Sequence, residues 1–237
     1  MRPHRINFVG GVYHVVTRCN NREFFFQDEA DFLDFLKILL RAKKMYQVEI
    51  YAYCITSNHV HLLVGTPRKA TLSRFMQYVN GNFARSYNRR HGKTGHFWGG
   101  RFHSTVIESE TQFFNCLLYI EANMVRCGAV KCPADWRWSS FRAHALGEYD
   151  EVLDFHDLYL QLGLTPQERQ EVYRAMTADR MAEKGLIRQP LFSQGVILGS
   201  HSFVQNLLTS LAPKLSSYRS RQAHETCFPD VFSLLRC

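Results

Sequence analysis

Hydrophobic and polar residues follow two different periods along the first hundred residues of the chain. Residues 11–19 alternate with the two-residue period of a β-strand, and the other predicted strands are residues 48–56, 59–66 and 102–108. Apolar side chains recur every third or fourth residue in residues 28–46 and 71–92, as in an amphipathic helix. The order strand-helix-strand-strand-helix-strand predicts an α+β fold with a ferredoxin-like, split β-α-β antiparallel sheet.

Residues 109–128 predict one more helix, which must fold back toward the sheet. It begins with a capping-box pattern, Ser109 to Gln112, and ends at Gly128. Apolar side chains occupy most of its circumference, and a narrow polar stripe lies opposite, formed by Gln112, Asn115, Tyr119, Asn123 and Arg126. This stripe is either an ordinary solvated face or a functional surface.

Two histidines interrupt the apolar strand 59–66. The strand period places the side chains of His59 and His61 on one face, roughly 6 to 7 Å apart, which is close enough to converge on one ion. Neutral imidazole is a common ligand of divalent metals. Either the two histidines are hydrogen-bonded structural residues, or they begin a metal site that Asn123 completes through its amide oxygen. In the second case Tyr119 points its hydroxyl at the group that the metal polarises, since a phenol needs a metal or a base to become a useful nucleophile at neutral pH.

The length of 237 residues favours a larger domain, residues 1–145, followed by a small helical extension, residues 146–237. Helices are predicted from Pro166 to about residue 184 and over residues 200–208. The basic tail, with Lys214, Arg219 and Arg221, is either a second DNA contact or the loose end of a helical brace.

The chain shows neither a secretory leader nor an apolar run long enough to span a bilayer, so a cytoplasmic protein with no membrane association is expected. Its seven cysteines include no Cys-x-x-Cys pair, and reduced, packed thiols are predicted.

The formal charge of +8 and the sequence pI of about 9.2 are compatible with a nucleic-acid partner, although many soluble proteins are as basic. One cluster is more specific, because cations there lie beside aromatic residues on which unpaired bases can stack. It comprises Arg89, Arg90, Lys93, Phe97, Trp98 and Arg101. The alternative is that both rings are buried as core and the cations are solvated.

Five blocks, in this order, make the chain similar to a known family over residues 8–145. They are residues 11–22 (GVYHVVTRCNNR), 58–61 (NHVH), 95–102 (GHFWGGRF), 119–126 (YIEANMVR) and 136–141 (WRWSSF). The chain resembles the REP-associated tyrosine transposases, which are relatives of the single-tyrosine insertion-sequence transposases.

By this resemblance, His59 and His61 match the His-hydrophobic-His (HUH) metal motif, Tyr119 the single nucleophile, and Asn123 the third metal ligand. A divalent ion, Mg²⁺ or Mn²⁺, is then the expected cofactor. The family usually has Asn-Pro-Val where this chain has Asn123-Met124-Val125, and more often has Gln where it has Gly99. The lost proline is expected to affect the end of the helix and the direction of Asn123.

The resemblance implies a metal-dependent endonuclease and strand transferase. Such an enzyme cleaves single-stranded DNA near hairpin-forming palindromic repeats through a 5′-phosphotyrosine intermediate, as a monomer or homodimer. The residues expected to contact DNA are Arg18, Asn20, Asn21, Arg89, Arg90, Lys93, Phe97, Trp98, Arg101 and Arg126. Two alternatives remain: a replication initiator or relaxase, which often carries paired tyrosines, and a DNA-binding regulator of the same fold without catalysis.

Overall fold

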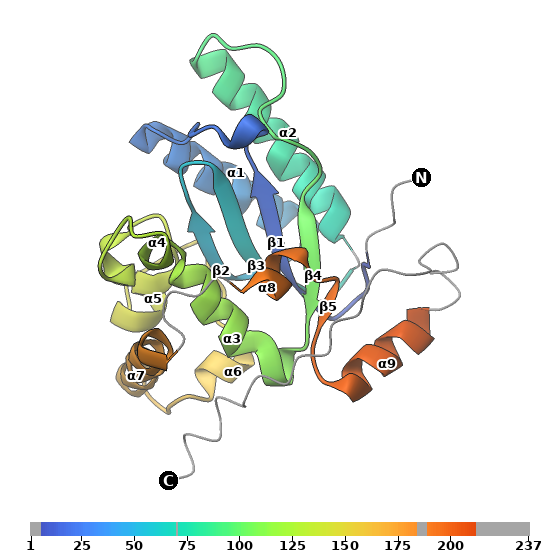
Figure 1. Ribbon diagram of the computed structural model, residues 1–237, viewed down its shortest axis with the longest axis vertical. Coiled ribbons are helices and arrows are strands. Elements are labelled where there is room, and N and C mark those ends of the chain that lie inside the picture. The colour runs from blue at the N-terminus through green and yellow to red at the C-terminus, as the bar shows by residue number, and fades with distance from the viewer. Residues whose placement is uncertain (1–5, 70, 184–188, 212–237) are drawn as a thin grey trace.

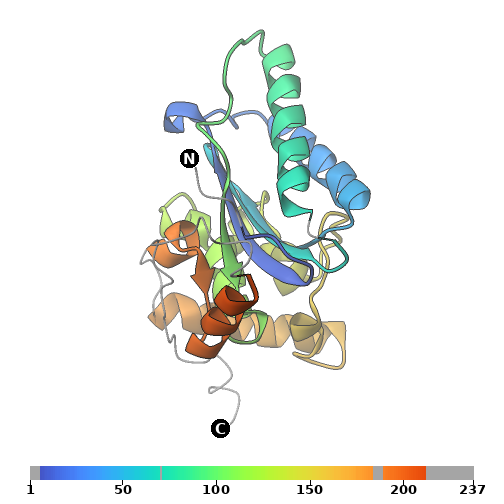
Figure 2. The ribbon, with the colours of Figure 1, turned by 90° about the vertical axis from the view of Figure 1, so that its right-hand side faces the viewer.

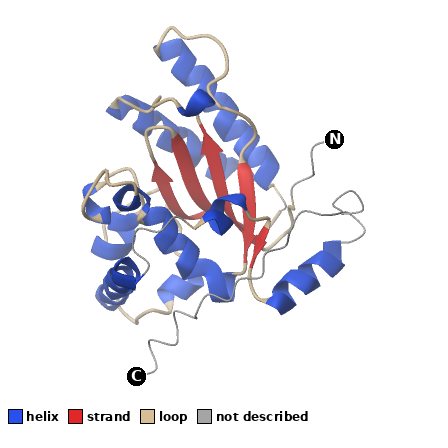
Figure 3. Ribbon diagram, in the orientation of Figure 1, coloured by secondary structure: helices blue, strands red, loops and turns tan. Residues whose placement is uncertain are grey.

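A twisted sheet of five strands forms the centre of the protein (Figures 1 and 3). The computed structural model describes residues 6–69, 71–183 and 189–211. The strands lie in the order β2-β3-β1-β4-β5. The first four pair antiparallel, and β5 pairs parallel with β4. Their bounds are β1 Gly11–Arg18, β2 Glu49–Ile55, β3 His59–Thr66, β4 His103–Ile107 and β5 Ile197–Leu198.

Helices cover both faces of this sheet. The pair α1 (Glu29–Tyr46) and α2 (Leu72–Arg90) lies on one face, and α3 (Ser109–Glu121) with α4 (Asn123–Arg126) lies on the other, as Figures 1 and 2 show. The first six elements therefore follow the predicted strand-helix-strand-strand-helix-strand order, and the α+β prediction is confirmed. The remaining helices are α5 (Phe141–Leu146), α6 (Asp157–Leu160), α7 (Pro166–Glu183), α8 (Pro190–Gln194) and α9 (His201–Leu211), with 3₁₀ turns at Asn20–Arg22 and Pro133–Asp135.

Alternate side chains of β3 enter two different cores. Val60, Leu62 and Val64 are buried in the cluster that contains the apolar residues of α1 and α2. Leu63 belongs to a second cluster, which contains the apolar residues of α3. Because side chains two residues apart share a face, His61 lies on the α3 side of the sheet with Leu63. One face of β3 is thus apolar except for Thr66 at its end, while the other face combines packing with polar groups.

The α3–α4 segment departs from the predicted continuous helix. The helix is interrupted at Ala122, so that α3 ends one residue before it and α4 begins at Asn123. The predicted capping box is wrong, because Glu108 occupies the N-cap position without a side-chain bond. Gly128 ends the segment as predicted, with a φ of +75° that few other residues adopt.

The polar stripe of this segment is not solvated. Gln112, Asn115, Tyr119 and Asn123 are each no more than 8% exposed. The side of α3 and α4 that carries Tyr119 and Asn123 faces β3, and C-terminal elements cover other parts of α3. Of the two interpretations of the stripe, the solvated face is wrong.

The region after residue 145 contains the two predicted helices, which correspond to α7 and α9. It also contributes β5, which the sequence did not predict, to the edge of the sheet. The division between residues 145 and 146 stays a prediction. The basic residues Lys214, Arg219 and Arg221 lie outside the described residues. Within the described ranges, none of the helices combines the length and the apolar character needed to cross a bilayer.

An aromatic cluster holds α1 and α2 against the sheet. The fully buried ring of Phe83 stacks on Phe26 at a centroid distance of 4.9 Å and meets Phe35 and Phe97 edge-on, each at 5.1 Å. Such pairs add to the large burial of apolar area by aromatic side chains. This cluster fixes the helical layer behind the strand that carries the histidines.

We predict that Phe83→Ala lowers the free energy of unfolding by about 3–5 kcal/mol, because it leaves a cavity in this cluster. Urea unfolding followed by circular dichroism measures the change. Phe24→Ala is the matched control, since the Phe24 side chain is 64% exposed and its loss should change stability little. Equal effects of the two substitutions would contradict this assignment of the core.

Candidate functional site

The two histidines of β3 have adjacent rings, with centroids 4.8 Å apart and planes at 78°. His61 is 3% exposed, and His59 is half-buried at the start of the strand. The Nδ1 atom of His59 lies 2.6 Å from Asn58 Oδ1 and 2.8 Å from Thr56 Oγ1. Because an amide oxygen only accepts, His59 Nδ1 donates to it, and the lone pair of the neutral ring is on Nε2.

The α3–α4 segment brings Tyr119 and Asn123 to these histidines. Asn123 Nδ2 lies 3.1 Å from His61 Nε2. The ring of Tyr119 meets that of His61 edge-on at a centroid distance of 6.2 Å. The four residues that the HUH motif and the helix motif predicted as one site therefore lie together, although 62 positions separate His61 from Asn123.

Arg126 and Phe192 hold the Tyr119 ring from two other elements. The Arg126 guanidinium carbon lies 3.9 Å from the centre of the Tyr119 ring, and its Nη1 donates a hydrogen bond of 2.9 Å to the Tyr119 carbonyl oxygen. The Phe192 ring, from α8, packs against Tyr119 at 4.8 Å. A cation over an aromatic face and a packed ring both restrict the tyrosine side chain. Arg126, which was predicted to bind DNA, thus contacts the tyrosine itself.

His14 of β1 is a buried part of this site that the sequence did not reveal. Its Nε2 lies 2.8 Å from His61 Nδ1, and its Nδ1 lies 2.5 Å from the carbonyl oxygen of Phe192. Burial lowers the pKa of His14 to about 3 and holds the pKa of His61 well below its usual value, with a smaller contribution from neighbouring His59. Both rings are therefore neutral at pH 7, the form in which imidazole binds metals.

The donor atoms fit a divalent cation. His59 and His61 offer imidazole nitrogens and Asn123 offers an amide oxygen, a mixed nitrogen and oxygen set of the kind that Mn²⁺ and similar ions accept. A second group of donors, Asp28, Asp31 and His91, also lies within 4.8 Å. There, however, the Arg90 guanidinium lies 3.0 Å from Asp31 and already supplies a positive charge, so we assign no metal to it.

A basic cavity of about 410 Å³ lies beside the histidine pair, at the end of β1. Arg18 pairs in register with His59, and His103 of β4 pairs with Val16, so these side chains share the sheet face of His61. Of the predicted DNA contacts, the cavity is lined by Arg18, Asn20, Asn21 and Arg101, together with Arg22 and His103, which were not predicted.

Gly99 lines this cavity and lies close to the backbone at the end of β1. Its amide donates a hydrogen bond of 2.9 Å to the Arg18 carbonyl oxygen, and an added Cβ would lie only 3.2 Å from the Cys19 carbonyl oxygen. The family more often has glutamine at position 99. The glycine of this chain thus lies where two backbone segments, at residues 18–19 and at residue 99, approach each other closely.

The remaining predicted DNA contacts lie around the end of α2. Arg89 and Lys93 are exposed, and Lys93 lies over the Phe25 ring at 4.7 Å. Arg90 forms ion pairs with Asp31 and Asp34. These three cations are set apart from the cavity at the end of β1.

The prediction that Phe97 stacks on bases needs correction. Its ring is 3% exposed and belongs to the aromatic core around Phe83, so it has no face to offer a base. Trp98 is half-buried, and its Nε1 donates a hydrogen bond of 2.9 Å to the carbonyl oxygen of Asn80. The core interpretation of this aromatic pair, which the sequence left open, therefore holds for Phe97.

Glu121, the last residue of α3, is a buried anchor between the tyrosine and Asn123. It is 1% exposed and accepts hydrogen bonds of 2.5 Å from Ser140, 2.8 Å from His144 and 2.5 Å from Tyr173. These partners come from the start of α5, from α5 and from α7. Glu121 thus ties the interrupted helix to the C-terminal half of the chain.

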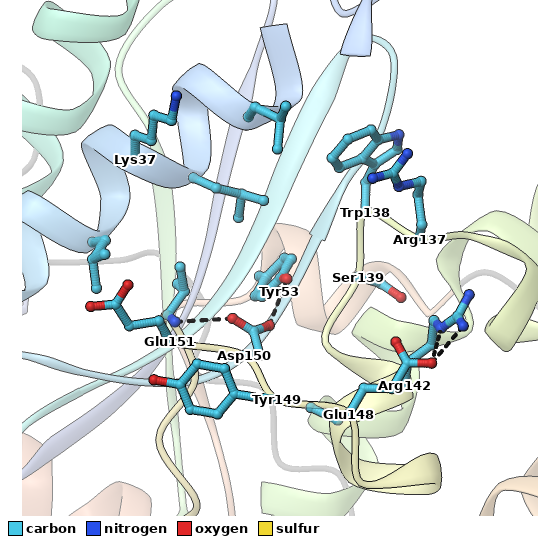
Figure 4. Close-up of a pocket in the computed structure, with 15 residues that line it drawn as sticks. Lys37, Tyr53, Arg137, Trp138, Ser139, Arg142, Glu148, Tyr149, Asp150 and Glu151 are labelled. Carbon is cyan, nitrogen blue, oxygen red and sulfur yellow. Dashed lines mark hydrogen bonds and ion pairs between the residues drawn. The ribbon is translucent and has the colours of Figure 1, made fainter. Parts of the chain in front are cut away.

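A larger cavity, of about 690 Å³, lies elsewhere, between α1, the edge strand β2 and residues 137–152 (Figure 4). Tyr53 donates a hydrogen bond of 2.7 Å to Asp150 across it, and Arg142 pairs with Glu148. None of the predicted site residues lines it. Its size alone does not make it a functional site.

Comparison with known proteins agrees with this geometry. The sequence profile of the family described as "Transposase IS200 like" matches residues 8–123. Residues 8–123 are therefore similar to this transposase family, and the predicted resemblance to the REP-associated tyrosine transposases is confirmed.

Two particular proteins carry the likeness. A Haemophilus influenzae protein described as a REP-associated tyrosine transposase is 29% identical over an alignment of 113 residues, and the match covers 44% of this chain and 64% of that protein. The chain therefore matches less than two thirds of the length of this relative. A solved REP-associated tyrosine transposase bound to a REP hairpin is 20% identical and superposes with a TM-score of 0.53, covering 66% of this chain and 92% of that one. This second likeness shows the shared fold.

We predict that Glu121→Ala lowers the free energy of unfolding by about 3–5 kcal/mol, because it leaves three buried partners without their acceptor. Glu121→Gln should cost less, since its amide oxygen still accepts from Ser140 and His144. Urea unfolding measures both. Glu148→Ala is the control, because it removes only the exposed pair with Arg142. An alanine variant as stable as the wild type would contradict the anchoring role of Glu121.

Proposed function

We propose that the protein is a metal-dependent endonuclease and strand transferase that cleaves single-stranded DNA next to hairpin-forming palindromic repeats. The observation that carries the proposal is the meeting of Tyr119 and Asn123, from the α3–α4 segment, with His59 and His61 of β3. A phenol, two imidazoles and a side-chain amide, whose oxygen can be turned toward a cation, are the parts that a metal-assisted transesterification requires.

In this proposal His59, His61 and Asn123 hold a divalent cation, Mg²⁺ or Mn²⁺, which when bound polarises a non-bridging oxygen of the scissile phosphate. The Tyr119 oxygen loses its proton to solvent and attacks phosphorus. The bond to the 3′ oxygen breaks, and that oxygen leaves with the electron pair and takes up a proton. The DNA 5′ phosphate is then esterified to Tyr119, which keeps the energy of the broken bond for rejoining.

The protein's own side chains prepare this attack. Arg126 and Phe192 hold the tyrosine ring from two sides, so that less side-chain freedom is lost when the substrate binds. The Arg126 guanidinium also places a positive charge next to the ring, where it favours an approaching phosphate.

The cavity at the end of β1 is the proposed path of the DNA strand. Arg18, Arg22 and Arg101 line it, on the sheet face that carries the histidines. Cations along a groove attract the phosphate backbone without reading sequence. The hairpin enters the proposal because the solved relative of the same fold is bound to a REP hairpin. A DNA-binding regulator of the same fold predicts the same groove but no covalent product.

We predict that Tyr119→Phe abolishes the covalent protein–DNA adduct while it leaves hairpin binding largely intact, because it removes only the attacking oxygen. The assay incubates the protein with hairpin-bearing single-stranded oligonucleotides and MnCl₂, and follows the adduct on denaturing gels. Mass spectrometry then identifies the nucleotide-linked peptide.

Tyr149→Phe is the matched control, since Tyr149 is 90% exposed and lines the other cavity. It should form adduct at the wild-type rate. Adduct formation by the Tyr119→Phe protein, or an undiminished adduct in EDTA, would refute the proposed mechanism. If the wild-type protein binds many hairpins but never forms the adduct, the regulator is the better function.

We predict that Arg101→Ala weakens binding to single-stranded hairpin DNA and makes it less sensitive to salt. The slope of log K against log salt concentration should become shallower by about 0.7, the contribution of one phosphate contact to a single strand. Fluorescence anisotropy over a series of KCl concentrations measures it. Arg137→Ala, which removes an exposed arginine paired with Glu29, should leave the slope unchanged. The opposite ranking of the two variants would place the DNA on the other face.

A further inference from the structure

Three buried groups form a hydrogen-bonded line that ends at the proposed metal site. The Phe192 carbonyl oxygen lies 2.5 Å from His14 Nδ1, and His14 Nε2 lies 2.8 Å from His61 Nδ1. His14 is fully buried, and the rings of His14 and His61 lie nearly parallel, with centroids 5.0 Å apart. They come from β1, β3 and α8, three elements that are far apart in the sequence.

The chemistry of these groups determines where each proton lies. A carbonyl oxygen only accepts, so His14 Nδ1 must carry the hydrogen. A neutral imidazole has one N–H, which leaves a lone pair on His14 Nε2. That lone pair requires a hydrogen on His61 Nδ1, and the lone pair of His61 therefore lies on Nε2. Both rings are neutral in this arrangement, because the two facing nitrogens share one hydrogen and the outer nitrogen of His61 faces a donor.

The other end of the line leads to the same assignment. Asn123 Nδ2, a donor, lies 3.1 Å from His61 Nε2, so this nitrogen must offer a lone pair. If His61 alone had the opposite tautomer, two lone pairs would meet between His61 Nδ1 and His14 Nε2. If both rings had it, the lone pair of His14 Nδ1 would meet the Phe192 carbonyl oxygen, and in either case two hydrogens would meet between Asn123 and His61.

We infer that His14 is a positioning residue, which fixes His61 in the Nδ1–H tautomer and so directs the lone pair of Nε2 into the site, where it accepts from Asn123 in this structure and would bind the metal in its place. Metal-binding histidines usually donate their second N–H to a carboxylate, a carbonyl or water. Here His61 donates its second N–H to another histidine, His14, and the Phe192 carbonyl oxygen orients His14. The assignment of the His61 tautomer does not depend on the proposed function. The consequence of this tautomer for metal binding does rest on the proposed function.

Helix α8 belongs to the proposed catalytic centre through Phe192. The Phe192 backbone orients His14, and the Phe192 ring packs on Tyr119. Thr105 of β4 holds this segment with hydrogen bonds of 3.1 Å to the Phe192 carbonyl oxygen and 2.7 Å to that of Gly195. The pairing of β5 with β4 fixes it further. Phe192, a residue of the C-terminal region, thus contacts both His14 and the proposed nucleophile Tyr119.

The direct test is the tautomer of His61 in the full-length, metal-free protein. Long-range ¹H–¹⁵N spectra of protein labelled with ¹⁵N-histidine distinguish the two tautomers, and loss of a signal in His61→Gln assigns His61. We expect Nδ1 of both His61 and His14 to be protonated. An Nε2–H tautomer of His61 in the wild-type protein would overturn the inference, whatever the activity of the protein.

Two substitutions separate orientation from mere packing. His14→Leu removes the acceptor, so the His61 signals should move toward an average of both tautomers, and the affinity for Mn²⁺, measured by titration calorimetry, should fall about 10–100-fold. His14→Gln supplies an amide oxygen that can accept from His61 Nδ1, and it should retain the tautomer and most of the affinity.

If both variants keep the wild-type tautomer and affinity, or both lose them equally while folded by circular dichroism, His14 does not position His61. Should His14→Leu fail to fold, the wild-type and His14→Gln spectra decide. Because no DNA is present, a missing covalent adduct would count against the proposed function and leave this result standing.

Discussion

The contact between the Asn123 amide and His61 Nε2 is the constraint on which the site depends. It joins a short helix to the middle of a strand, and it fixes how α3 and α4 lie on the sheet. Tyr119 is one turn before this contact, so its distance from the histidines follows from it. The break at Ala122 lies between these two residues. The end of α3 is where the lost family proline was expected to matter.

Burying so many polar groups on one face of a sheet is costly unless each finds a partner. On the α1–α2 face, β3 buries three aliphatic side chains and Thr66, whose hydroxyl donates to the Phe8 carbonyl oxygen. On the other face, His14, His61 and Asn123 satisfy one another, and Glu121 has three donors. Buried polar groups that bond to one another restrict the arrangements that the side chains can adopt. This side of the sheet therefore holds its reactive groups in a defined geometry before any substrate arrives.

The sequence predicted those features that local periodicity or a motif encodes. The alternation through Val60, Leu62 and Val64 located β3 and assigned its faces, and the motifs selected Tyr119 and Asn123. Periodicity does not determine how two strands are aligned, so the contact between His14 and His61 could not be predicted from it. It also could not tell the buried ring of Phe97 from an exposed one. The role of the Phe192 carbonyl has no side-chain signature at all.

The C-terminal region changes how the chain is best divided. The resemblance fades near residue 145, which suggested a separate extension, yet Phe192 contacts Tyr119, the proposed nucleophile, and Tyr173 contacts Glu121. The matched family profile ends at residue 123 and includes neither residue. Because both contacts are buried, a protein cut at residue 145 would expose polar groups that the intact chain satisfies. We therefore propose that the described part of residues 146–237 belongs to the proposed catalytic centre, although the sequence resemblance does not extend to it.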